Sequence, residues 1–261
     1  MSTRSRHGGR HELGQNFLVH HPTVDRVVGL VAVTDGPVLE IGAGDGALTV
    51  PLARLGRDLT AIDLDEHLVR RLRRRLPSVR VEHTDVLRHP LDRPVVVGNV
   101  PFHLTTPVLR RLLTRDRWQH AILLAQWEVA RKRAGVGGAT MMTAQAGPWF
   151  TFTLHGRVPA QHFRPAPGAD GGLLAVARRT EPLVPARERS GYEAFVRRVF
   201  TGRGRTLADV VAGATRSTRR EAHALLASCG VAARALPRDL DAGQWARLWR
   251  ELPRRQGVRH A

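Results

Sequence analysis

Over the first two thirds of the chain, short apolar runs alternate with stretches whose apolar residues recur at helical spacing. The apolar runs are rich in β-branched residues and have the length of buried strands. They fall at residues 38–41, 58–65, 79–86, 94–100 and 120–126. Helical spacing is found between them, for example at Leu68, Leu72 and Leu76, which lie four residues apart. Strands that alternate with helices are typical of an open, doubly wound α/β sheet.

From residue 150 on, the chain follows two other patterns. Residues 150–158 and 171–179 predict two further strands, and the loop between them is too short for a crossover helix. This end of the sheet is therefore expected to be antiparallel. After Pro182 the apolar residues recur only at helical spacing. We expect a sheet domain at residues 1–180 and a small helical domain at residues 181–261.

Composition is that of a globular protein outside the membrane. The chain has 261 residues, of which 42% are hydrophobic, and this is enough to fill a core. It contains no run of 18 apolar residues, and its first fifteen residues lack the apolar segment of a signal peptide. Cys229 is the only cysteine, so no internal disulfide can form. We expect a cytoplasmic protein that is a monomer.

The charge balance indicates a polyanionic partner. Lys and Arg number 41 against 23 Asp and Glu, which gives a formal net charge of +18. Genomic base composition could explain why Lys132 is the only lysine, but it does not explain the excess of basic over acidic residues. Nucleic acid is the expected partner. The 16 arginines and 8 acidic residues of 181–261 make that segment the most basic per residue, whereas the arginines of 67–76 are interpreted as the solvated face of a crossover helix.

A glycine-rich turn follows the first predicted strand. Gly42, Gly44 and Gly46 occupy alternate positions between that strand and the start of a helix. Such a turn lets the backbone lie close to a ligand, but its spacing differs from the dinucleotide and phosphate-loop patterns, so pyrophosphate is not expected. Glu40 would repel phosphate, whereas it could attract the ammonium of an amino-acid moiety such as that of S-adenosyl-L-methionine. A turn without any ligand is the alternative.

Acidic residues stand at the ends of the next two predicted strands. In open α/β sheets the ligand lies beyond the carboxyl ends of the strands. Asp63 ends the second strand, where a carboxylate can accept hydrogen bonds from both hydroxyls of a ribose. Asp85 ends the third, where it can accept a hydrogen bond from an adenine amine. Beside the glycine turn, the pair favours a nucleoside site.

The fourth strand ends in Asn99, Val100, Pro101 and Phe102, which is the most specific signal in the sequence. The exocyclic amine of adenine is a poor nucleophile because its lone pair is delocalised into the ring. An enzyme that transfers a group to it must accept its N–H groups, as the Asn99 Oδ1 and the Val100 carbonyl can. Pro101 restricts the backbone that aims this carbonyl, and Phe102 offers a face on which an extruded base can stack.

These motifs, taken together, resemble a known family. ELGQNFL, EIGAGDG, Asp63, Asp85, NVPF, QWEVARKRAGVGGATMM and FRPAPGADGGLL are similar to the motifs of ribosomal RNA adenine dimethyltransferases. Within that family the sequence resembles the Erm methyltransferases, which confer resistance to macrolide, lincosamide and streptogramin B antibiotics. The resemblance covers roughly residues 10–180.

The resemblance implies a fold, a cofactor and a substrate. The fold is a class I, Rossmann-like methyltransferase sheet with a small all-helical C-terminal domain. The cofactor is S-adenosyl-L-methionine, and the substrate is one adenine in the peptidyl-transferase region of 23S ribosomal RNA. In the family's pattern the cofactor is bordered by Gln15, Asn16 and Leu18, lies over Gly42, Gly44 and Gly46, and is bound by Asp63, Asp85 and Asn99. The acidic residue that binds the ribose is usually glutamate in this family, so the side chain of Asp63 is one methylene shorter than usual.

Three other functions stay open on the sequence. The nearest is the enzyme that dimethylates two adenines of small-subunit RNA on the same fold, although the segment from Gln126 to Ala130 favours the Erm group. A DNA adenine methyltransferase could use the same site chemistry. A non-catalytic RNA-binding relative is the third. Zinc-protease, cysteine-cluster and serine-hydrolase motifs are absent, so no metal site is expected among the 13 histidines.

Overall fold

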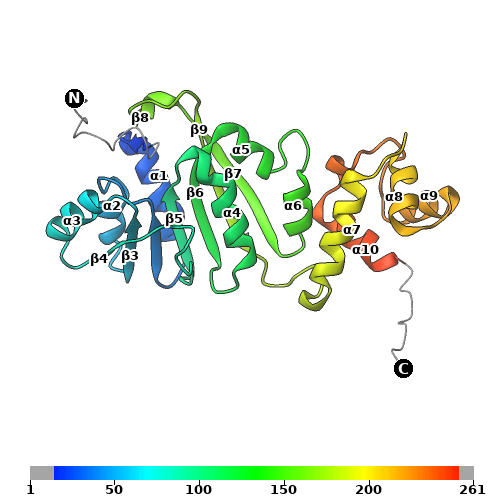
Figure 1. Ribbon diagram of the computed structural model, residues 1–261, viewed down its shortest axis with the longest axis horizontal. Helices are drawn as coiled ribbons and strands as arrows, with labels where there is room; N and C mark the ends of the chain where they lie inside the picture. Colours follow the sequence, from blue (N-terminus) through cyan, green and yellow to red (C-terminus); the bar gives the residue numbers. More distant parts are fainter. Residues whose placement is uncertain (1–14, 253–261) are drawn as a thin grey trace, which may run out of the picture. The chain divides into compact units, whose positions relative to one another are not determined.

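The computed structural model describes residues 15–252 and contains two sheets (Figure 1). The main sheet has seven strands in the order β4-β3-β2-β5-β6-β9-β7, and a separate two-stranded sheet pairs β1 with β8. The strands are β1 (Phe17–Leu18), β2 (Val38–Ile41), β3 (Leu59–Asp63), β4 (Arg80–His83), β5 (Val95–Asn99), β6 (His120–Gln126), β7 (Phe150–Val158), β8 (Phe163–Arg164) and β9 (Gly171–Arg178).

Ten α-helices connect or follow these strands in the described part of the chain. They are α1 (His21–Ala32), α2 (Thr49–Ala53), α3 (Glu66–Arg75), α4 (Thr105–Thr114), α5 (Trp127–Arg133), α6 (Met141–Ala146), α7 (Arg189–Thr201), α8 (Leu207–Thr215), α9 (Arg219–Ser228) and α10 (Ala242–Glu251). Two short 3-10 helices also matter for the site: η1 (Phe102–Leu104) and η2 (Ala160–His162).

The strand order of the main sheet confirms the predicted α/β architecture. From β4 to β6 all neighbouring strands are parallel. The chain reverses its direction of travel across the sheet between β2 and β5, whose carboxyl ends therefore flank the usual ligand position of such sheets. β9 runs antiparallel to β6 with Leu174 opposite Leu123, so this end of the sheet is antiparallel as expected.

Helices cover both faces of the sheet. On one face, residues such as Val27 of α1, Leu52 of α2 and Val69 of α3 pack against the strands in one buried cluster. On the opposite face lies α4 (Figure 1), which buries Val108 and Leu109 among others. A parallel strand that is covered on both sides needs apolar residues at successive positions. This explains why β2 and β3 are buried along their whole length.

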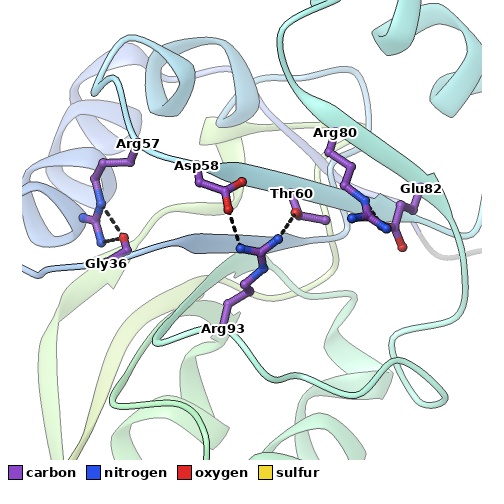
Figure 2. Close-up of polar contacts among 7 residues, drawn as sticks. All are labelled: Gly36, Arg57, Asp58, Thr60, Arg80, Glu82 and Arg93. Atoms are coloured by element: carbon purple, nitrogen blue, oxygen red, sulfur yellow. Dashed lines mark hydrogen bonds and ion pairs between the residues drawn. The ribbon is translucent and has the colours of Figure 1, made fainter.

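Arginines join the loops at the amino ends of the strands (Figure 2). Arg57 Nε donates to the Gly36 carbonyl at 2.7 Å, and Arg57 Nη1 donates to the Val31 carbonyl at 2.9 Å, so this side chain ties the end of α1 to the start of β2. Arg93, just before β5, forms an ion pair of 2.5 Å with Asp58, just before β3. These contacts lie at the end of the strands away from the predicted site and stabilise the sheet itself.

The chain divides into two compact units. The first comprises the residues up to Arg131 together with Phe152–Arg178, and the second comprises Lys132–Thr151 together with the chain after residue 178. The chain thus passes into the second unit next to the boundary expected at 180. Lys132–Thr151, expected in the sheet domain, groups with the helices because α6 packs on α7, where Tyr192 Oη donates to the Ala144 carbonyl at 2.7 Å.

The second unit is helical and has an aromatic core. The ring of Phe195 meets that of Trp245 nearly edge-on at 6.0 Å between centroids, and Phe200 stacks on the same tryptophan at 5.9 Å. Capping boxes begin α8 at Thr206, α9 at Thr218 and α10 at Asp241. The predicted helical C-terminal region is therefore confirmed. None of the helices within residues 15–252 has the length and apolar character of a membrane span.

Candidate active site

A cavity of about 250 Å³ lies in the first unit beyond the carboxyl ends of β2, β3 and β5. Most of the residues predicted for the site line this cavity. They are Gln15, Asn16, Gly42, Gly44, Asp63, Asp85, Asn99, Val100, Pro101 and Phe102. Leu18, Glu40 and Gly46 were predicted as well and are not on its wall.

The three glycines of the turn serve different purposes. All have positive φ, at +70° for Gly42, +56° for Gly44 and +93° for Gly46. A Cβ on Gly44 would lie 3.0 Å from the ring of Phe17, so this glycine leaves room at the cavity wall. A Cβ on Gly46 would lie only 2.6 Å from Leu72 of α3. Gly46 therefore lies behind the turn, where it permits the close packing of α3, and it does not line the cavity.

Asp63 is held by the backbone of the turn and of its own loop. Its Oδ2 accepts from the Gly44 amide at 2.7 Å and its Oδ1 accepts from the Asp65 amide at 2.8 Å. The residue is only 7% exposed. Burial raises the pKa of this carboxyl above its ordinary value, while the two amide hydrogen bonds act in the opposite direction. Each oxygen retains a second lone pair with which to accept a hydroxyl group.

Asp85 lines the cavity, and one of its carboxylate oxygens is held by its own loop. Oδ1 accepts from the Leu87 amide at 2.8 Å, which fixes the side chain at the start of its loop. Oδ2 lies 4.0 Å from Arg88 Nε, and the Arg88 side chain is 88% exposed. An exposed pair at this distance contributes little, so Oδ2 remains able to accept a hydrogen bond from a ligand.

Asn99 has a defined amide orientation. Its Nδ2 donates to the Asn16 carbonyl at 2.7 Å. Since the amide nitrogen is used in this way, Oδ1 is the atom left to accept a hydrogen bond from a substrate. The next residue, Val100, is 2% exposed and donates its own amide to the Leu124 carbonyl at 3.1 Å, so the loop is attached to β6.

Pro101 and Phe102 continue this loop along the cavity wall. Pro101 has φ −48° and ψ 131°, and its carbonyl accepts from the Leu104 amide at 2.8 Å to start η1. The ring of Phe102 meets the buried ring of Phe163 edge-on, with 6.4 Å between centroids and 79° between planes. Phe102 is thus held from one side by a neighbouring aromatic residue while it lines the cavity.

The two-stranded sheet of β1 and β8 brings the N-terminal segment to the site. Phe17 pairs with Arg164, and Leu18 pairs with Phe163. Phe17 lines the cavity although it was not predicted, whereas the predicted Leu18 is 3% exposed and belongs to the hydrophobic core. Adjacent residues of a strand point to opposite sides. Leu18 therefore lies on the opposite side of this short strand from Phe17.

Glu40 lies behind the glycine turn and not at the cavity. It is 1% exposed, and its Oε2 has no hydrogen-bond partner in residues 15–252. Burial raises the pKa of Glu40 from 4.5 to about 8, and the charges of Asp63 and Asp45 act in the same direction. Most of this carboxyl is then protonated at neutral pH, and this leaves little charge with which to attract an ammonium group.

Sequence reasoning missed several apolar residues of the cavity, among them Ile62, Val86 and Leu104. Each lies within two residues of a predicted one, and this proximity is the signal that could have identified them. Together they make parts of the wall apolar beside the two aspartates, as expected for a site that holds a flat base and a polar sugar. The described residues contain no group of three or more His, Cys, Asp or Glu that could hold a metal ion.

The fold and the cavity define an α/β methyltransferase. A glycine turn after β2, an acid at the end of β3, an acid after β4, and an Asn-Val-Pro-Phe segment that begins at the end of β5 line one cavity. The sequence matches the family described as "Ribosomal RNA adenine dimethylase" over residues 6–253. The chain belongs to this family, and it is an rRNA adenine N-6-methyltransferase.

Relatives and solved structures agree with this assignment. The mycinamicin-resistance protein MyrB of Micromonospora griseorubida is 50% identical over 258 residues, which are 97% of this chain and 82% of that protein. The rRNA adenine N-6-methyltransferase of Corynebacterium diphtheriae is 50% identical over 207 residues, 78% of this chain and 82% of that protein. The crystal structure of the 23S rRNA methyltransferase ErmE matches with a TM-score of 0.82 and 31% identity, covering 91% of this chain and 99% of ErmE.

Proposed function

We propose that this protein methylates the exocyclic amine of one adenine in 23S ribosomal RNA, and that the modification confers resistance to macrolide, lincosamide and streptogramin B antibiotics. The target RNA is inferred from the likeness to ErmE, and the resistance from the likeness to MyrB. The observation that carries the chemistry is the Asn99 amide, whose Nδ2 is bound to the Asn16 carbonyl so that Oδ1 is left for the substrate amine.

The residues that line the cavity suit S-adenosyl-L-methionine. Gly42 and Gly44 leave the wall open where a Cβ would meet the Asn99 carbonyl or the Phe17 ring. Asp63 would accept hydrogen bonds from the ribose hydroxyls and Asp85 Oδ2 one from the adenine amine, and Gln15 and Asn16, which line the same cavity, would border the cofactor. Glu40, Gly46 and Leu18 would support this site from behind the wall. When bound, the cofactor supplies an electrophilic methyl group on a sulfonium.

The residues of the Asn-Val-Pro-Phe loop act on the target adenine. A paired or stacked adenine is hidden, so the base must leave the helix, and Phe102 offers a face on which it can stack. Asn99 Oδ1 and the Val100 carbonyl accept from the amine and favour the tetrahedral nitrogen that makes its lone pair available. When the nitrogen gains a methyl group it becomes acidic and releases a proton to water. No dedicated general base is required.

The helical unit is proposed to add RNA affinity and little catalysis. It carries exposed arginines such as Arg203, Arg205 and Arg220, none of which forms an ion pair within the described residues. Contacts of this kind with phosphates release counterions and make binding sensitive to salt. We further infer that the enzyme acts as a monomer in the cytoplasm, where its ribosomal substrate is made.

Transfer of a labelled methyl group tests the proposal. The purified protein is incubated with labelled S-adenosyl-L-methionine and, separately, with protein-free large-subunit and small-subunit RNA, and the modified base is then mapped. We expect one labelled adenine in 23S RNA, with Asn99→Ala as the inactive control. Label in small-subunit RNA would instead indicate the biogenesis enzyme, to which Chlorobium limicola methyltransferase A offers 31% identity over 207 residues. Label in neither RNA would overturn the proposal.

A further inference from the structure

The wall of the cavity is acidic and has little to attract RNA. Among the described residues, its acidic side chains are those of Asp63 and Asp85, and its only basic side chain is that of His103. Arg88 is the arginine nearest in sequence to Asp85, and its Nε lies 4.0 Å from the Asp85 carboxylate. An RNA strand that delivers an adenine here also brings phosphates close to two carboxylates. A cation beside the opening is needed to offset this repulsion.

Arg164 occupies such a position. It is the residue of β8 whose Cα pairs with that of Phe17, and Phe17 lines the cavity. Residues opposed in an antiparallel pair lie about 5 Å apart, so the Arg164 backbone adjoins the wall. Its neighbour Phe163 points into the core and touches Phe102, while Arg164 itself is exposed.

The guanidinium of Arg164 is available for an anion. Within residues 15–252 it makes no ion pair and no hydrogen bond. The acid close in sequence, Asp170, is already occupied, because its Oδ1 accepts from the Ala160 amide at 2.7 Å and its Oδ2 pairs with Arg157 at 2.5 Å. The guanidinium N–H donors of Arg164 are therefore free to bind a phosphate.

The strand that carries Arg164 is firmly attached. The rings of His20 and His162 stack at 3.5 Å between centroids and 15° between planes. Thr23 Oγ1 lies 2.9 Å from His20 Nδ1 and 3.2 Å from His162 Nδ1, so one hydroxyl links both rings. The Val19 amide also donates to the His162 carbonyl at 2.8 Å. The start of β8 is thus joined to the start of α1. Because the backbone is already ordered here, binding of a ligand loses little conformational entropy.

We propose that Arg164 is an RNA-positioning residue that binds the phosphate backbone beside the extruded adenine. This inference rests on the proposed function and extends it to the nucleotides that flank the target. The contact fixes the register of the strand over the cavity and carries no base specificity of its own.

Arg164→Ala tests the contact, with Arg74→Ala as the matched control. Arg74 is also an exposed arginine, but it lies near the end of α3, nine residues beyond Asp65 where that helix starts. With 23S RNA as the probe, Arg164→Ala is expected to raise the KM for RNA about tenfold, the ratio for one charge-assisted hydrogen bond. It is expected to lower the salt slope of RNA binding by roughly 0.7–0.9. Arg164→Lys keeps the charge and is expected to restore the slope but only part of the affinity.

Several results would overturn the inference. Arg164→Ala could match the wild type in KM and salt slope, or Arg74→Ala could change both as much, which would indicate diffuse attraction instead of a contact. A loss of S-adenosyl-L-methionine affinity in Arg164→Ala would indicate damage to the cavity wall. If the wild type labels no RNA, the proposed function fails as well, whereas a wild type that labels 23S RNA beside an unaffected Arg164→Ala rejects this inference alone.

Discussion

Replacing Glu40 by glutamine removes an ionisable group from behind the glycine turn and almost nothing else. The side chain is 1% exposed, and its neighbour Thr49 Oγ1, like Glu40 Oε2, lacks a hydrogen-bond partner in the described chain. Glutamine has the same shape but cannot ionise. The comparison therefore isolates the effect of burying this carboxyl on the pH dependence of folding.

The magnitude follows from the pKa. Burial raises the pKa of Glu40 from 4.5 to about 8. Because the folded value lies above the unfolded one, the folded state binds more protons between these two values, and stability falls as pH rises through this interval. Linkage predicts that ionisation of this residue lowers the free energy of unfolding of the wild type by about 4 kcal/mol between pH 5 and pH 9. Glu40→Gln is expected to lack this loss.

Urea unfolding at a series of pH values measures the difference. The free energy of unfolding of Glu40→Gln minus that of the wild type is expected to rise from pH 5 and to level off above a pH of about 8, whatever its value at pH 5. If the glutamine amide lacks a hydrogen-bond partner in the folded state, this difference shifts by about 1–3 kcal/mol at every pH, and its slope against pH is unchanged. Parallel profiles for the two proteins would refute the reasoning and show that Glu40 is ionised in the folded state at neutral pH.

Four further substitutions test the site and the fold. Asn99→Ala is expected to lower turnover about 100-fold or more at saturating RNA and cofactor, because the lost acceptor acts mainly in the transition state; a rate near that of the wild type would contradict this. Phe102→Ala is expected to lose about 1–3 kcal/mol of base stacking in RNA turnover assays, while Phe102→Tyr keeps a ring and is tolerated. Gly46→Ala is expected to cost about 1–2 kcal/mol of stability in urea, since a side chain is strained at positive φ. Arg57→Ala is expected to cost about 1–3 kcal/mol in the same assay, with the KM for RNA unchanged, because the carbonyls of Thr34 and Gly36 lose the donor that Arg57 provides.

Local patterns were sufficient for the main sheet. The predicted strand at 120–126 coincides with β6, and those at 150–158 and 171–179 coincide with β7 and β9 to within one residue. β6 and β9 are nearly continuous buried apolar runs, and β7 begins with a run of aromatic and β-branched residues, so local composition identifies each of them. Because the ligand position of such a sheet follows from its topology, Asp63, Asp85 and Asn99 could be grouped before their side chains were seen.

Contacts between segments that are far apart in the sequence could not be predicted from local patterns. β1 and β8 have two residues each, too few to show any period, and they are 145 residues apart along the chain between Leu18 and Phe163. Neither strand was predicted, and Phe17 was missed with them. α6 has six residues and is also too short to show a period. Lys132–Thr151 was therefore expected in the sheet domain.

The orientation of Asn99 shows how these two levels depend on each other. The sequence identifies an asparagine at the end of β5, but its amide could turn either way, and only one of its two ends can accept from an adenine amine. The Asn16 carbonyl decides this by taking Nδ2. Asn16 directly precedes β1, and β1 is held by β8 and by the hydrogen bond from Val19 to His162. The chemistry that the local motif provides is therefore directed by a pairing that no local motif encodes.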